Sequence, residues 1–176
     1  MSEASSNPVP DQLTLQELNV HSAQVAEDFF YQICHCKRWA KEMVAARPFA
    51  NRRELKKVAE QLWENPTEEE ILEAFAGHAR IGDLSALQEK YSAASKEQGQ
   101  QMAESSPEII QQLFEDNNRY FEQNGFIFIV CASGKSAREM LTLLRTRLFN
   151  NREQELMNGA AEQGKITALR LSERVV

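Results

Sequence analysis

Apolar side chains recur every three to four positions along most of this chain, which is the spacing of a helix that buries one face. The clearest case lies between Ser22 and Ile33, where five apolar residues share a face: Val25, Ala26, Phe29, Phe30 and Ile33. The same spacing, bounded by cap residues and breakers, predicts a short helix after Thr14 and further helices near residues 39–47, 51–62, 67–76, 84–91, 106–124, 136–148 and 152–173.

Cap residues mark where several of these helices begin and end. Thr14 with Glu17, and Thr67 with Glu70, have the spacing of capping boxes, and Gly77 is a typical helix stop. The last predicted helix has one face whose small members allow a neighbour to pack closely: Met157, Ala160, Ala161, Gly164, Ala168 and Leu171.

One apolar run departs from helical spacing. Phe126 to Cys131 are six consecutive apolar residues, and their Ile and Val content suits a buried strand. We find no second strand to pair with it, so a buried extended link between helices is the better interpretation. The pattern predicts an all-α fold, a single-domain compact bundle of about 8–10 helices over residues 13–176, preceded by a flexible arm over residues 1–12.

Composition narrows the classes of partner. The formal net charge is −6, from 20 basic and 26 acidic side chains, which argues against nucleic-acid or anionic-membrane binding. No apolar run approaches the roughly 20 residues of a membrane helix. Three cysteines at low density do not suggest a disulfide framework, so we expect a reducing compartment, the cytoplasm by default.

Two short motifs suggest chemistry that their surroundings do not support. Gly134-Lys135-Ser136 resembles the end of a phosphate-binding loop, but the glycine required five residues earlier is Ile129. A helix N-terminus capped by Ser136 fits better. Cys34-His35-Cys36 suggests a metal site, but structural zinc requires a second pair of ligands. We therefore expect core cysteines on an amphipathic helix and no metal.

A histidine follows the predicted helix stop directly, in the stretch from Phe75 to Asp83 that also holds two glycines, an arginine and an aspartate. Imidazole titrates near neutral pH, at roughly 6.5, so His78 on such a loop can exchange protons with a ligand. From the residues alone, a loop histidine that bonds its neighbours is the simpler interpretation. Glu97 and Arg170 likewise fit a solvated helix face, and their spacing does not single them out.

The segments taken together resemble the 2-oxo-4-hydroxy-4-carboxy-5-ureidoimidazoline (OHCU) decarboxylases of urate breakdown, from about Leu18 to Leu171. Five elements in order carry the resemblance: Trp39-Ala40-Lys41-Glu42-Met43 with Arg47-Pro48-Phe49, His78-Ala79-Arg80-Ile81-Gly82-Asp83, Ser95-Lys96-Glu97-Gln98, Asn124 to Ala132 continuing through Gly134-Lys135-Ser136, and Glu162 to Leu171. One position departs from the family pattern, because Ala79 stands where the family usually has proline. Proline would restrict the main chain of the histidine before it.

The resemblance implies a cofactor-independent decarboxylase with OHCU as its small-molecule substrate and (S)-allantoin as its product, and a homodimer. It implies His78, Glu97 and Arg170 as catalytic residues. It also implies a substrate-binding set: Ala79, Ser95, Gln98, Phe128, Ile129, Val130, Cys131 and Ala132. Two alternatives stay open at this stage. The first is a non-catalytic helical module that binds a ureide or a partner protein, and the second is a related lyase acting on another ureido acid.

Overall fold

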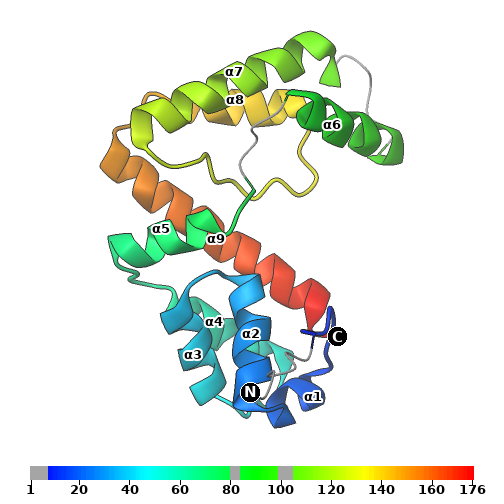
Figure 1. Cartoon of the computed structure of the whole chain (residues 1–176), viewed down its shortest axis with the longest axis vertical. Coiled ribbons are helices and arrows are strands. Elements are labelled where there is room, and N and C mark those ends of the chain that lie inside the picture. Colours follow the sequence, from blue (N-terminus) through cyan, green and yellow to red (C-terminus); the bar gives the residue numbers. More distant parts are fainter. Residues whose placement is uncertain (1–7, 80–83, 99–104) are drawn as a thin grey trace, which may run out of the picture. The chain divides into compact units, whose positions relative to one another are not determined.

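The computed structural model describes residues 8–79, 84–98 and 105–176, and of residues 92–98 it describes the main chain alone. In these ranges the regular elements are nine α-helices and no strand, which confirms the predicted all-α fold (Figure 1). The helices are α1 (Leu15–Val20), α2 (Ala23–Ile33), α3 (Lys37–Ala45), α4 (Arg52–Leu62), α5 (Glu68–Ala76), α6 (Leu84–Gln98), α7 (Pro107–Asn124), α8 (Ala137–Arg147) and α9 (Arg152–Arg174).

The predicted caps are present, with one difference. Thr14 and Glu17 form a complete capping box at α1. At α5 the hydroxyl of Thr67 accepts from the main-chain N–H of Glu70, as predicted. The carboxylate of Glu70 does not complete the box, because it accepts hydrogen bonds from the Thr67 hydroxyl and from Arg38 instead. The ion pair between Glu70 and Arg38 on α3 therefore replaces the second hydrogen bond of the capping box.

The described residues form two compact units, which we treat separately. The first holds α1 to α5 and the part of α9 from Gln163 onward, and the second, His78–Glu162, holds α6, α7, α8 and the beginning of α9.

Aromatic rings from three segments form the core of the first unit. The ring of Phe30 meets Trp39 and Phe49 edge to face, at centroid distances of 5.8 and 6.4 Å. Trp39 is fully buried, and its indole N–H donates to the main-chain oxygen of Ala59 on α4, at 3.1 Å. The tryptophan therefore packs against α2 through its ring and bonds α4 through its indole N–H.

The two ends of the described chain meet in this unit. Leu13 and Val175 form an isolated parallel bridge. The guanidinium of Arg174 donates to the main-chain oxygens of Pro10 and Asp11, at 3.0 and 2.8 Å. Residues 1–7 of the predicted arm lie outside the described residues, whereas Pro10 and Asp11 are tied to the last turn of α9.

In the second unit, α7 packs against α8 and α6, and an irregular segment joins α7 to α8. The segment begins at Gly125, which ends α7 with a left-handed φ of 79° that favours glycine. It ends at Ser136, which forms a complete capping box with Glu139 at the start of α8. Residues 127–132 have no regular secondary structure, which agrees with the predicted link in place of a strand.

Candidate active site

The candidate histidine lies directly after α5, where the sequence predicts it. Gly77 is the C-cap of that helix, and its main-chain N–H donates to Ala74. His78 is half-buried and Ala79 is exposed. An imidazole at the start of a non-helical segment, partly open to solvent, is accessible to a ligand and to protons.

Several predicted site residues lie partly or wholly outside the described residues. Ser95, Glu97 and Gln98 belong to the main chain of α6, while their side chains lie outside the described residues. Residues 80–83, the second half of the histidine motif, lie outside the described residues altogether.

The link between α7 and α8 holds the predicted substrate-binding residues from Phe128 to Ala132. Ile129 is buried, and the other four are half-buried. The main-chain N–H of Cys131 donates to the carboxylate of Glu162, at 3.4 Å, and its carbonyl accepts from the ammonium of Lys135, at 2.9 Å. Side chains of the same unit therefore fix the main chain of the link at Cys131.

A second and stronger anchor for the link comes from two residues that the sequence analysis did not identify. Arg147, the last residue of α8, donates from Nη1 to the main-chain oxygen of Ile129, at 2.6 Å. Its Nε donates to Oε1 of Glu155, at 2.7 Å. Glu155 has no exposed surface. No sequence signal separates Glu155 from the exposed Glu153 two positions earlier, so spacing alone could not have found this pair.

The surroundings of Glu155 keep its carboxylate charged. Burial by itself would raise the pKa of Glu155, but hydrogen bonds from Tyr120, Asn150 and Asn158 and the charge of Arg147 outweigh burial and lower this pKa below its ordinary value. Burial and the hydrogen bond to this carboxylate raise the pKa of Tyr120, so its phenol stays protonated and donates. The result is a charged pair in which both carboxylate oxygens of the buried Glu155 accept hydrogen bonds.

Arg170 belongs to the first unit, on the C-terminal part of α9. Its side chain is half-buried, and Nη1 donates to the main-chain oxygen of Ile33, the last residue of α2, at 2.9 Å. This bond fixes the guanidinium at the carboxyl end of a helix, where the helix dipole favours a cation. His78 and Arg170 lie in different units.

Cys34 and Cys36 are buried in the core of the first unit, but their predicted place on a helix is wrong. Cys34 is the C-cap of α2 and Cys36 the N-cap of α3, so residues 34–36 form the connection between the two helices. The ring of His35 stacks on Tyr31, at 4.4 Å between centroids. Within the described part of the chain, no group of three or more His, Cys, Asp or Glu side chains is arranged to hold a metal ion.

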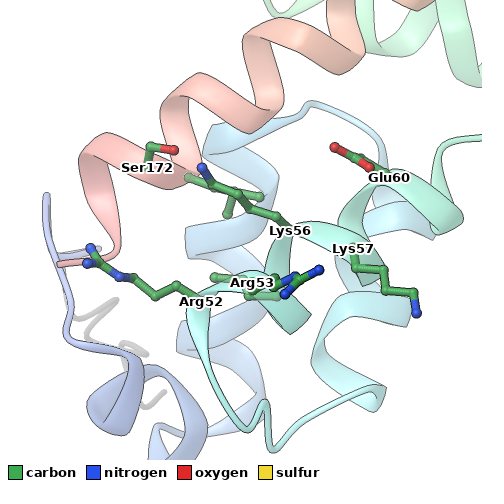
Figure 2. A pocket seen from close by; sticks show the side chains of 8 residues that line it. Arg52, Arg53, Lys56, Lys57, Glu60 and Ser172 are labelled. Carbon is green, nitrogen blue, oxygen red and sulfur yellow. The ribbon is translucent and has the colours of Figure 1, made fainter.

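The first unit also has an open cavity of about 690 Å³ between α4 and the end of α9 (Figure 2). It is lined by Arg52, Arg53, Leu55, Lys56, Lys57, Glu60, Leu171 and Ser172. Its four cations lie on the exposed face of α4, and Arg52 donates to the main-chain oxygen of Val175, at 3.4 Å. None of the predicted catalytic or substrate-binding residues lines this cavity.

Comparison with known proteins identifies the family. The family model described as OHCU decarboxylase matches residues 19–172, which is most of the chain. The chain belongs to the OHCU decarboxylase family. The resemblance seen in the sequence is thereby confirmed. None of the described helices is long and apolar enough to cross a membrane.

Relatives in this family are proteins of urate breakdown. The chain is 34% identical over 153 residues to the uric acid degradation bifunctional protein TTL of Arabidopsis thaliana, a match that covers 85% of this chain and 47% of the plant protein. It is 24% identical over 161 residues to the bifunctional protein PucL of Bacillus subtilis, covering 91% of this chain and 32% of the bacterial protein. The chain thus spans about half or less of the length of these curated relatives.

Solved structures of the family share the fold. An OHCU decarboxylase crystallised in the presence of (S)-allantoin superposes with a TM-score of 0.68 at 34% identity, covering 83% of this chain and 96% of that one. A structure of (S)-allantoin synthase gives a TM-score of 0.65 at 18% identity, covering 96% and 54% of the two chains, which shows a common fold.

Proposed function

We propose that this protein decarboxylates OHCU to (S)-allantoin in urate breakdown. The observation that carries the proposal is the family match, which runs through residues 19–172 and therefore includes the positions of His78, Glu97 and Arg170. A relative that is 34% identical was crystallised in the presence of (S)-allantoin, which supports a small ureide as the ligand.

The reaction requires little of the protein beyond orientation and one proton. The bond between the ring carbon and the carboxylate breaks, CO₂ leaves, and the electron pair stays on the ring carbon. The adjacent ring carbonyl and nitrogens delocalise that pair, and a proton added to one face of the carbon gives one enantiomer of allantoin. The residues must therefore bind the carboxylate, stabilise the developing anion and deliver the proton.

Three side chains suit these tasks. His78 lies beside the leaving carboxylate and donates the proton, which an imidazole that titrates near neutral pH does well. Glu97 accepts a hydrogen bond from the substrate hydroxyl or a ring N–H and assists its deprotonation. Arg170 pairs with an oxygen-rich part of the ligand through its forked N–H groups.

The remaining predicted residues bind and orient the ligand. The main chain from Phe128 to Ala132 holds the ureido group and the ring amides, and Ala79, Ser95 and Gln98 line the site. Because Ile129 and Cys131 are bonded to Arg147, Glu162 and Lys135, the link offers a preorganised main chain to the ligand.

The test is circular dichroism at the chiral band of allantoin, with the substrate made in place from urate by urate oxidase and hydroxyisourate hydrolase. We expect rapid formation of (S)-allantoin on addition of the protein. His78→Asn should lower turnover by roughly 10²–10⁴, the usual contribution of one general acid–base group. His21→Asn, at the C-cap of α1, is the matched histidine control and should leave turnover unchanged.

Glu97→Gln separates a chemical role from a structural one, because it should reduce turnover far more than melting temperature. A wild-type rate equal to the spontaneous, racemic decay of the substrate would refute the decarboxylase. In that case, saturable binding of (S)-allantoin without turnover would identify the alternative, a ureide-binding module, and Ala79 is the sequence feature that favours it.

We also propose a homodimer in the cytoplasm. The three free cysteines support a reducing compartment. Sedimentation equilibrium should give twice the chain mass of 20.1 kDa. A single species at the chain mass across micromolar concentrations would exclude the dimer.

A further inference from the structure

Glu155 is the centre of a buried polar cluster in the second unit, made of Tyr120, Arg147, Asn150, Glu155 and Asn158. Its two carboxylate oxygens accept four hydrogen bonds. Oε1 accepts from the Tyr120 hydroxyl at 2.6 Å and from Arg147 Nε at 2.7 Å. Oε2 accepts from the side-chain amides of Asn150 and Asn158, each at 2.8 Å. The cluster thus joins α7, the end of α8 and the beginning of α9.

Two side chains of this cluster, those of Arg147 and Tyr120, both contact the link at Phe128. Arg147 bonds the main-chain oxygen of Ile129 at 2.6 Å, and its guanidinium lies 4.8 Å from the centre of the Phe128 ring. The ring of Tyr120 meets Phe128 edge to face, at 5.4 Å. The polar cluster therefore holds one residue of the link by its main chain and the preceding residue by its side chain.

Such a cluster contributes little net stability to a fold, because the free energy of removing its charges from water offsets their attraction. A buried ion pair loses the hydration of both charges, and well-packed apolar side chains of similar volume often stabilise a protein as well or better. Nη2 of Arg147 is buried and has no hydrogen-bond partner among the described residues, which adds to the cost. A directional function explains the charged pair better than stability does, because a guanidinium fixes both the position and the orientation of a carbonyl.

The bonds to the link leave two of its residues unanchored. Ile129 is bonded through its main-chain oxygen, and Cys131 through both its main-chain N–H and its carbonyl. The main-chain groups of Phe128 and Val130 form no hydrogen bond with any of the described residues. These are the groups that the link can offer to a ligand.

We propose that Arg147 and Glu155 are positioning residues of the active site, which orient the link so that Phe128 and Val130 present their main-chain groups to the substrate. Neither residue touches the substrate. Glu155 fixes the guanidinium, and the guanidinium fixes the link. The inference rests on the proposed function for the identity of the ligand, whereas the link geometry is a property of the free protein.

The test combines a readout of the free protein with one of the ligand complex. In the free protein, amide chemical shifts of residues 128–131 should change in Arg147→Lys, which keeps the charge but loses the forked geometry. Affinity for (S)-allantoin by calorimetry should fall, and KM should rise, by up to about 10²-fold, the scale of an ångström-sized misplacement. Glu155→Gln, which keeps the shape of the side chain, should produce a smaller change of the same kind.

A neighbouring ion pair supplies the matched control. Arg145 on the same helix donates to Asp116, at 2.9 Å, and its hydrogen-bond partners among the described residues, Asp116 and Gln112, both lie on α7. Arg145→Lys should leave the amide shifts of residues 128–131, the allantoin affinity and KM as in the wild type. If Arg147→Lys lowers the melting temperature with unchanged link shifts and affinity, the pair is structural and the proposal is wrong.

Two further outcomes are informative. If Arg147→Lys does not fold, Phe128→Leu still tests the idea, because it removes the ring beneath the guanidinium while leaving the main chain, and it should shift the amides of Ile129 and Val130. If the wild type neither binds nor turns over the ureides, the proposed function fails. Unchanged link shifts in every folded variant refute the positioning role, whatever the substrate.

Discussion

Gly77 lies so close to the imidazole of His35 that a Cβ atom on Gly77 would stand 2.3 Å from Cγ of His35. The φ of Gly77 is −75°, which any residue adopts, so glycine is required here for space. His35 cannot easily move away, because its ring stacks on Tyr31 at 4.4 Å. The residue before His78 is therefore placed by close packing against the connection between α2 and α3.

This contact predicts that Gly77→Ala destabilises the protein by about 1–3 kcal/mol, the usual cost of overpacking. It should also lower turnover, because the displaced main chain continues directly into His78. Urea unfolding monitored by circular dichroism measures the first effect, and the allantoin assay measures the second.

His35→Gly provides the control for this prediction, since it removes all three atoms that the new Cβ would meet, namely Cβ, Cγ and Nδ1 of His35. In the His35→Gly background, the added cost of Gly77→Ala should largely disappear. If the two costs simply add, the glycine is needed for another reason.

Arg170 allows a second prediction, because its guanidinium donates to the main-chain oxygen of Ile33, at 2.9 Å. Arg170→Lys keeps a cation but cannot donate in a forked manner to Ile33 and to a ligand together. We expect turnover to fall by up to about 10²-fold, while stability changes by about 1 kcal/mol, the net contribution of one hydrogen bond. Steady-state kinetics and urea unfolding measure these two quantities.

Arg53→Lys is the matched control, since Arg53 is an exposed arginine of the same unit that lines the cavity in Figure 2. Arg53→Lys should change neither the turnover nor the free energy of unfolding. Equal kinetics for Arg170→Lys and the wild type would remove Arg170 from the site.

The three free cysteines should react at different rates. Burial raises the pKa of the Cys34 thiol to about 12, although the Thr167 hydrogen bond and the charge of Arg170 oppose it. Burial also raises the pKa of Cys36. Because the thiolate is the reactive form, both should resist alkylation at pH 8, and the half-buried Cys131 should react first. Peptide mass spectrometry after timed iodoacetamide treatment measures the order.

Alkylation in urea is the control, since unfolding should make the three rates similar. Reaction of Cys34 as fast as Cys131 in the native protein would mean that the core of the first unit opens readily.

The sequence predicts well those features that depend on neighbouring residues. The caps at Thr14 and Ser136, the end of α7 at Asn124 and the irregular link that follows it are all found in the structure. Gly164 also behaves as predicted, because a Cβ there would meet the indole of Trp63 at 3.4 Å. Each of these depends on local main-chain geometry or on the size of one side chain.

Features that depend on distant partners are missed. Periodicity places Met157 on a buried face, but it is 66% exposed, whereas Glu155 on the same helix has no exposed surface. A charged residue is buried when donors surround it, and three of the four donors here lie outside α9: Tyr120 on α7, Arg147 at the end of α8 and Asn150 between α8 and α9. Spacing within one helix carries no information about those donors, so the cluster around Glu155 could be found only in the structure.

The same cluster predicts how stability depends on pH. Burial favours the protonated Glu155, but its four hydrogen-bond donors and the charge of Arg147 lower the folded-state pKa below the unfolded value of roughly 4.3. A carboxyl with a lowered pKa contributes stability above the unfolded pKa, and this contribution is lost as the pH falls through the folded value. The free energy of unfolding should therefore decrease in acid partly through Glu155.

Glu155→Gln removes this titration while keeping the shape of the side chain, so the stability difference between wild type and variant should be largest near neutral pH and shrink below about pH 4. Glu153→Gln, an exposed residue one half-turn earlier, should give a curve parallel to the wild type. Urea unfolding between pH 3 and pH 7 measures all three proteins. A constant difference between wild type and Glu155→Gln across this range would mean that the Glu155 carboxyl titrates alike in the folded and unfolded chains, and that the cluster does not hold it charged.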